Sequence, residues 1–116
     1  MNRTEPLTQG EVEFRILAIS DALDENTELL SSLLVERATA EADFKHAFAK
    51  AMIGLAGTSM PVAAKEAKAQ FHTEVEFRSW KLWEAREKAC QQKLHSLRSQ
   101  LDALRTIAAN VRAVTR

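Results

Sequence analysis

The sequence predicts an all-α protein, an antiparallel αα-hairpin of two long helices that meet along a coiled-coil-like seam and oligomerise. Three observations lead to this fold class. The 116 residues include only 3 glycines and 2 prolines, too few turn residues for a β fold. Apolar residues recur at spacings of three and four along two long stretches. Only one segment, GTSMP at residues 57–61, visibly interrupts them.

The first helix is predicted at about residues 9–56. Thr8 and Glu11 have the spacing of a capping box, which marks a helix start. An apolar stripe follows, formed by Val12, Ile16, Ile19, Leu23, Leu30, Leu33, Phe44, Phe48, Ala51 and Leu55. Gly57 is the natural residue for a left-handed C-cap, and Gly54 marks fraying or a close backbone approach. The turn is therefore expected at about residues 57–60.

The second helix is predicted at about residues 61–114, capped by Thr58 or Ser59 with Pro61 in its first turn. Its predicted seam is formed by Phe71, Val75, Leu82, Trp83, Cys90, Leu94, Leu97, Leu101, Leu104, Ala108 and Val111. A short turn makes the two helices antiparallel neighbours in a single domain, with position 28 opposite about 88.

A two-helix hairpin buries only one narrow stripe of each helix, so apolar side chains elsewhere need another partner. We therefore expect a homo-oligomer whose interface includes Leu29, Leu34, Phe77 and Trp80. Phe77 and Trp80 fall on the back of the second helix on a helical wheel, and Lys81 lies beside Phe77. Stacking on nucleobases is the alternative role for these two aromatic side chains.

The zero net charge hides an asymmetry between the halves of the chain. Residues 1–58 carry −5 and residues 59–116 carry +5, so opposite charges face each other and help to fix the register. Near the turn, residues 45–81 hold six basic and three acidic side chains. The candidate nucleic-acid-binding residues are Lys45, Lys50, Lys65, Lys68, His72 and Lys81. Either these cations bind a phosphate backbone or they form an ordinary solvated helix end.

The sequence contains no convincing catalytic constellation, so an enzyme is not expected. Three separated histidines and the lone Cys90 lack metal-ligand spacing, and no Gly-rich phosphate loop is present. We expect no cofactor and no metal. The start of the chain has no secretory pattern and no apolar run approaches a membrane span, which favours the cytoplasm, here that of a bacterial host.

Two segments together resemble a known family. EADFKHAFAKAMIGLAGTS is a lysine- and aromatic-containing helix that ends at glycine, and KEAKAQFHTEVEFRSWKLWEAREKACQQKLHSLRSQLDALRTIAANVR is a second helix. This order is similar to phage recombination mediators of the UvsY type over roughly residues 38–113. The resemblance matches Lys50 to the family's basic segment, Lys65 and Lys68 to the lysines that open the next helix, and Trp80 or Trp83 to its aromatic residue.

The resemblance implies an oligomer that binds single-stranded DNA, displaces single-strand-binding protein and loads a RecA-like recombinase. The chain departs from the family in its shorter turn and in Gly54 and Leu55, which stand where the family has tyrosines. The alternative function is a structural or regulatory coiled-coil adaptor that acts only through protein–protein contacts.

Overall fold

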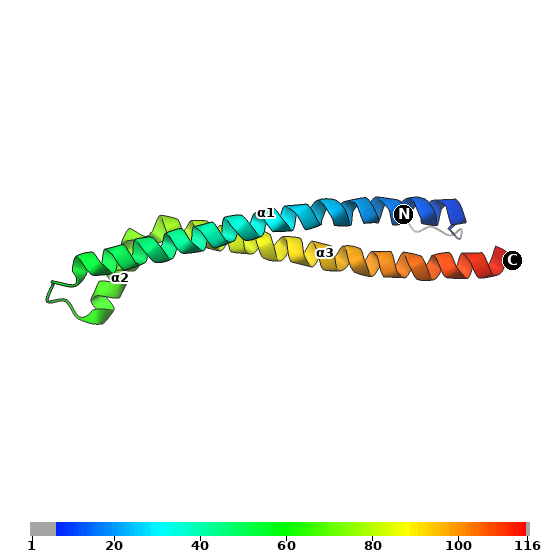
Figure 1. Ribbon diagram of the computed structural model, residues 1–116. Helices are drawn as coiled ribbons and strands as arrows, with labels where there is room; N and C mark the ends of the chain where they lie inside the picture. The colour runs from blue at the N-terminus through cyan, green and yellow to red at the C-terminus, as the bar shows by residue number, and fades with distance from the viewer. Residues whose placement is uncertain (1–6, 116) are drawn as a thin grey trace. The chain divides into compact units, whose positions relative to one another are not determined.

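A computed structural model describes residues 7–115 and shows three helices (Figure 1). They are α1 (Gln9–Leu55), α2 (Val62–His72) and α3 (Glu74–Thr115). Over these described residues the chain contains no strand, so the predicted all-α fold class is confirmed. None of these helices combines the length and the apolar character that crossing a membrane requires.

The chain folds as two compact units, which are described separately. Unit 1 consists of the residues up to Leu29 and those from Cys90 onwards, so it joins the first part of α1 to most of α3. Unit 2 is Leu30–Ala89 and holds the rest of α1, the turn, α2 and the start of α3. The expectation of a single domain stays a prediction.

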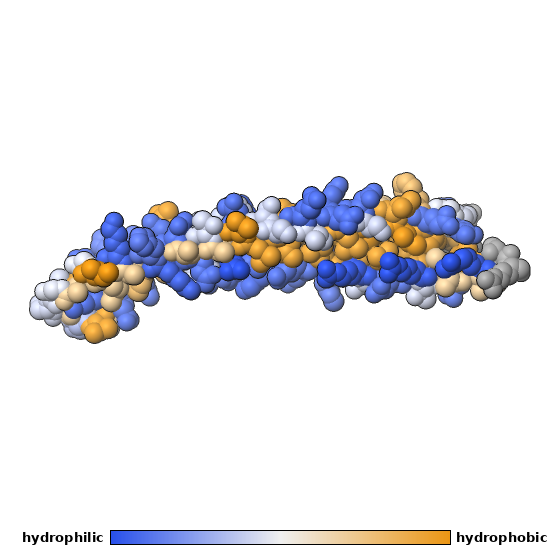
Figure 2. All heavy atoms as spheres, in the orientation of Figure 1, coloured by the Kyte–Doolittle hydropathy of each residue, from blue (hydrophilic) through white to orange (hydrophobic). Residues whose placement is uncertain are grey.

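Unit 1 is a two-helix coiled coil with an almost entirely apolar seam. Buried and half-buried side chains follow alternating steps of three and four, which is the heptad pattern of helices that pack side by side. On α1 they are Val12, Ile16, Ile19, Leu23 and Asn26; on α3 they are Cys90, Leu94, Leu97, Leu101, Leu104, Ala108 and Val111. Figure 2 shows apolar side chains gathered along the line where α1 and α3 meet in this unit, between rows of hydrophilic ones.

One hydrogen bond across the unit 1 seam fixes the register. The Cys90 thiol donates to the backbone carbonyl of Asn26 at 3.4 Å, and the Asn26 amide donates to the carbonyl of Ala22 at 2.7 Å. Position 26 therefore lies opposite position 90, which confirms the predicted antiparallel register within this unit. The single polar side chain in the seam, Asn26, satisfies its donor within its own helix.

Unit 2 continues the same heptad spacing but fills it with different residues. The seam of α1 here comprises Leu30, Leu33, Arg37, Ala40, Phe44, Ala47 and Ala51; that of α2 and α3 comprises Ala69, Thr73, Glu76, Trp80, Trp83 and Glu87. Four of these thirteen side chains are charged or hydroxylic, which makes this seam far more polar than that of unit 1. The predicted seam was wrong here, because Phe71, Val75 and Leu82 are exposed.

The start of α1 is as predicted and its end is not. The Thr8 hydroxyl accepts from the Glu11 N–H at 3.2 Å, and the helix begins at Gln9. At the other end, the Thr58 hydroxyl and N–H both donate to the carbonyl of Leu55, at 2.7 and 3.1 Å. Gly57 does not have a positive φ, so the left-handed cap was wrong. A Cβ on Gly54 would meet nothing within 4 Å, so no close approach requires that glycine.

The predicted second helix is two helices, separated at Thr73. Pro61 is the N-cap of α2 and makes no side-chain cap, so Thr58 and Ser59 do not have the capping role predicted for them. Thr73 has φ −112° and ψ 20°, and its hydroxyl donates to the carbonyl of Ala69 at 2.8 Å. A buried threonine that bonds back to residue i−4 bends a helix, which explains the break.

Candidate nucleic-acid interface

All six predicted nucleic-acid-binding residues lie in unit 2, on all three helices. Lys45 and Lys50 are on α1, Lys65, Lys68 and His72 are on α2, and Lys81 is on α3; all are exposed except Lys65, which is half-buried.

Ion pairs divide these cations into two groups. Lys45 lies 3.2 Å from Glu41, and Lys81 lies 3.5 Å from Glu84. Lys50, Lys65 and Lys68, in contrast, have no carboxylate within 4.0 Å among the residues that the structure describes. A cation without a local partner is available for a phosphate, so these three lysines are the better candidates.

The basic residues of α2 form a ridge together with one exposed aromatic side chain. Lys65, Lys68 and His72 are spaced i, i+3 and i+7, which places them on one stripe of the helix. Phe71, beside them, is 74% exposed, and its ring meets that of His72 edge to face at 5.8 Å between centroids. We call these four residues the α2 ridge. Sequence reasoning did not assign Phe71 to this site, because it placed that residue in the helix seam.

Phe77 and Trp80, expected on the back of the second helix, pack against α1 instead. The Phe44 ring lies 5.3 Å from Phe77 and 5.4 Å from Trp80 between centroids, and 5.9 Å from Phe48. The predicted placement on the back of the helix was therefore wrong. The Lys81 ammonium lies 4.3 Å from the Trp80 ring centroid, at cation–π distance. Trp80 is half-buried by this cluster, which makes it a poor stacking surface for a nucleobase.

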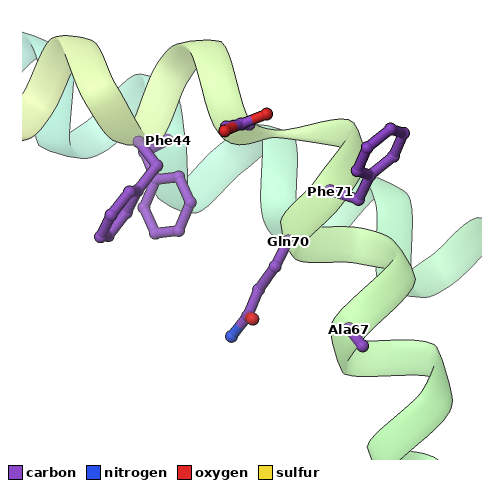
Figure 3. Close-up of a pocket in the computed structure, with 6 residues that line it drawn as sticks. Phe44, Ala67, Gln70 and Phe71 are labelled. Carbon is purple, nitrogen blue, oxygen red and sulfur yellow. The ribbon is translucent and has the colours of Figure 1, made fainter.

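A hollow of about 560 Å³ opens beside the aromatic cluster (Figure 3). Its lining residues are Phe44, Ala67, Gln70, Phe71, Glu74 and Phe77. Gln70 and Phe71 project from α2 in different directions, and Phe44 reaches the hollow from α1. Most of these lining side chains are apolar. In the sequence of α2, Lys68 directly follows Ala67 and His72 directly follows Phe71.

The two leucines predicted at an oligomer interface are both exposed. Leu29, in unit 1, is 49% exposed, and Leu34, in unit 2, is 37% exposed. Their role at an interface stays a prediction, as does that of Phe77 and Trp80.

An ion-pair network crosses the seam of unit 2. Arg37 donates to Glu87 at 2.7 Å on the facing helix and to Glu41 at 2.8 Å on its own. The hydrogen bond to Glu87, and then that to Glu41, raises the pKa of Arg37. The hydrogen bond from Lys45, and then that from Arg37, lowers the pKa of Glu41. Lys45 is thus part of a structural network as well as a candidate contact.

A second apolar stripe lies on the outside of unit 2, and sequence reasoning placed three of its residues in the seam. Phe71, Val75, Leu82, Ala85 and Ala89 follow the heptad spacing on the solvent side of α2 and α3, and all are exposed. We call this set, with the intervening Arg78, the outer stripe. Counting back from Cys90 in steps of three and four reaches Glu87, Trp83 and Trp80, which are the residues of the buried seam. The same count excludes the residues of the outer stripe, so the sequence did contain a signal that they lie outside the seam.

Comparison with known proteins adds no assignment. No family model matches the chain, and neither curated proteins nor solved structures include a significant match. Among the described residues, no three His, Cys, Asp or Glu side chains gather to hold a metal ion. The similarity to mediators of the UvsY type thus stays an expectation from sequence.

Proposed function

We propose that this chain is a non-enzymatic accessory protein of DNA recombination, which self-associates, binds single-stranded DNA through unit 2 and assists the loading of a RecA-like recombinase on DNA held by single-strand-binding protein. One observation supports it above the others. In the α2 ridge, two lysines and a histidine lie beside an exposed phenylalanine. Neither lysine has an ion pair among the described residues.

The chemistry of single-strand binding fits this ridge. Cations that neutralise phosphates release condensed counterions, and exposed aromatic rings stack on unpaired bases. Lys65 and Lys68 supply the charge, and Phe71 replaces Trp80 as the stacking surface. A few cations on one chain bind weakly, so association of several chains would raise the affinity for one strand through avidity. The resemblance in sequence supports the recombination context.

A salt titration tests the proposal. Binding of the wild-type chain to a labelled single strand is measured by fluorescence anisotropy from low to high salt. Each lost phosphate contact lowers the slope of log K against log salt by about 0.7 on single strands. Lys65→Glu/Lys68→Glu is therefore expected to lower the slope by about 1.4, and to weaken binding at low salt more than tenfold.

A matched control separates the ridge from bulk charge. Lys93→Glu makes the same charge change at an exposed lysine of unit 1 and is expected to bind almost like wild type, whereas Lys68→Glu alone is not. Phe71→Ala should weaken binding at every salt concentration without changing the slope, because stacking releases no counterions. Absence of binding by the wild type at low salt would reject the proposal.

The outer stripe favours a second candidate, an adaptor that acts only through protein–protein contacts. Val75 is 78% exposed and Leu82 is 51% exposed, on a helix whose other face is already packed. Exposed apolar residues at heptad spacing are typical of a surface that receives another helix. The titration decides between the two, because the adaptor would associate with protein and leave the labelled strand unbound.

A further inference from the structure

The outer stripe of unit 2 carries positive charge within it and along one edge. Arg78 lies within the stripe, and Lys81 and Lys88 follow one edge of it. They pair with their helix neighbours, exposed Glu74 and half-buried Glu84, at 2.5 to 3.5 Å. Such exposed pairs are weak and exchange readily for another carboxylate. The surface therefore combines apolar side chains with cations that are available to a partner.

The solvent side of α1 in unit 1 has the opposite composition. Phe14 and Leu17 are 73% and 65% exposed, and a run of exposed acids, Asp21, Asp24, Glu25 and Glu28, follows them. Among the residues described, these four carboxylates have no lysine or arginine nitrogen within ion-pair distance. We call Phe14, Leu17 and the four acids the acidic face.

The spacing of the two surfaces matches when both helices run in the same direction. Asp21 and Asp24 are three residues apart on α1, and Arg78 and Lys81 are three residues apart on α3. Residues on a helix keep their axial spacing of about 1.5 Å each, so one parallel register brings both opposite-charge pairs together. Phe71 lies on α2, beyond the break at Thr73, and is outside this register. The antiparallel register that pairs Asp21 with Lys81 and Asp24 with Arg78 also sets Glu28 against Glu74.

We propose that the acidic face of α1 in one copy of this chain lies parallel against the α3 part of the outer stripe in a second copy, with Asp21 beside Arg78 and Asp24 beside Lys81. The contact joins two different surfaces, so a pair held by one such contact leaves one outer stripe and one acidic face free. These two either meet each other in a two-fold dimer or bind further chains. This inference deepens the self-association within the proposed function. It leaves the α2 ridge, Phe71 included, outside the contact.

Charge exchange between two variants tests the contact. Variant A is Asp21→Lys/Asp24→Lys, and variant B is Arg78→Asp/Lys81→Asp. Masses are measured by sedimentation velocity for each full chain, and helix content by circular dichroism. We expect the wild type above the mass of one chain, each variant alone at the mass of one chain, and an equimolar mixture of A and B restored to larger assemblies, since both mixed contacts are attractive again.

Several outcomes would overturn the proposal: a wild-type chain that stays monomeric at high micromolar concentration, a variant A that keeps the wild-type mass, or a mixture that does not reassemble. The second outcome would indicate that the outer stripe pairs with its own copy, because variant A leaves that stripe intact. If a charge reversal unfolds the chain, Asp21→Asn/Asp24→Asn and Arg78→Gln/Lys81→Gln serve instead, each weakening association about tenfold. Unchanged association in both would also reject the contact.

The DNA proposal fails separately. None of these variants changes Lys50, Lys65 or Lys68, and the salt titration is repeated on each. Loss of DNA binding by the wild type with an assembled mass rejects only the DNA proposal. Salt-dependent DNA binding by a wild-type chain whose mass does not respond to the charge exchange rejects only this contact.

Discussion

The buried seams of units 1 and 2 follow the same heptad spacing, but they differ in which residues are buried and which are exposed. In unit 1 the seam is leucine-rich, with Leu94, Leu101 and Leu104 buried, and the outside of α1 is acidic. In unit 2 the seam contains Arg37, Glu76 and Glu87, while the outside carries Phe71, Val75 and Leu82. Hydrophobic burial inside stabilises a hairpin, and apolar surface outside serves contacts with something else. The difference assigns stability mainly to unit 1 and interaction mainly to unit 2.

Two buried polar atoms in unit 2 support this division. Glu76 Oε2 and Trp80 Nε1 are buried without a hydrogen-bond partner. Such groups are costly, because burial removes water that would otherwise satisfy them. In the unit 1 seam, the polar atoms of Asn26 and Cys90 both have partners across or along the helices. Unit 2 is thus built with a seam that is not optimised for stability.

The largest expected effect compares one leucine from each unit. Leu94 is 2% exposed in the unit 1 seam, so Leu94→Ala should destabilise the fold by about 2 to 4 kcal/mol. Leu82 is 51% exposed, so Leu82→Ala should change stability by no more than about 0.5 kcal/mol. Urea unfolding followed by circular dichroism measures both, at a protein concentration where the variants have the same mass.

Tryptophan fluorescence sharpens that measurement, because both tryptophans, Trp80 and Trp83, lie in unit 2. Separate transitions by dichroism and fluorescence would show that the units unfold independently, and Leu94→Ala should then shift only the dichroism transition. Equal losses from Leu94→Ala and Leu82→Ala would contradict the assignment of stability to unit 1.

The next effect concerns the Arg37–Glu87 pair in the unit 2 seam. Arg37→Leu should lower the urea midpoint, by less than Leu94→Ala does, because Glu87 is only 13% exposed and loses its partner across the seam. Arg37→Leu/Glu87→Leu should recover the midpoint or exceed it, since packed apolar residues often replace an ion pair without loss. A double variant less stable than Arg37→Leu would show that the pair itself stabilises unit 2.

The sequence was sufficient to predict the helices and the unit 1 seam, because strong apolar periodicity and the Thr8 cap act locally. It was insufficient in unit 2 for a physical reason. Hydropathy follows apolar residues, and around residues 71–82 the apolar residues lie outside while Thr73 and Glu76 lie inside. The buried seam and the outer stripe have the same heptad spacing in this region, and the outer stripe is the more apolar of the two. Hydropathy therefore favours the outer stripe as the seam, which is wrong.

Within the candidate site, the positions of the lysines could be predicted from the sequence and those of the aromatic residues could not. Lysines near the turn remain near the turn whatever the rotation of the helix, so Lys50, Lys65 and Lys68 lie where they were expected, while their role in binding stays a prediction. The roles of Phe71 and Trp80 depend on which face of the helix is buried, and an error in the seam exchanges them. The break at Thr73 depends on a side-chain hydrogen bond to Ala69 that no periodicity records.

The smallest expected effect uses pH to isolate the charged network of unit 2. The bonds from Lys45 and Arg37 lower the pKa of Glu41 in the folded chain, so folding favours its ionised form. A carboxyl whose pKa falls on folding stabilises the protein at pH values above its pKa in the unfolded chain, about 4.3. That contribution is lost as pH falls through the lower pKa of the folded chain.

Thermal unfolding followed by tryptophan fluorescence should therefore show a steeper fall in Tm below about pH 5 for wild type than for Glu41→Gln. Glu36→Gln, an exposed carboxyl of unit 2 with no ion pair among the described residues, should instead keep the wild-type slope. Parallel Tm profiles for wild type and Glu41→Gln would mean that the network orients Arg37 towards Glu87 without stabilising the fold, which would leave the polar seam of unit 2 with a role in positioning alone.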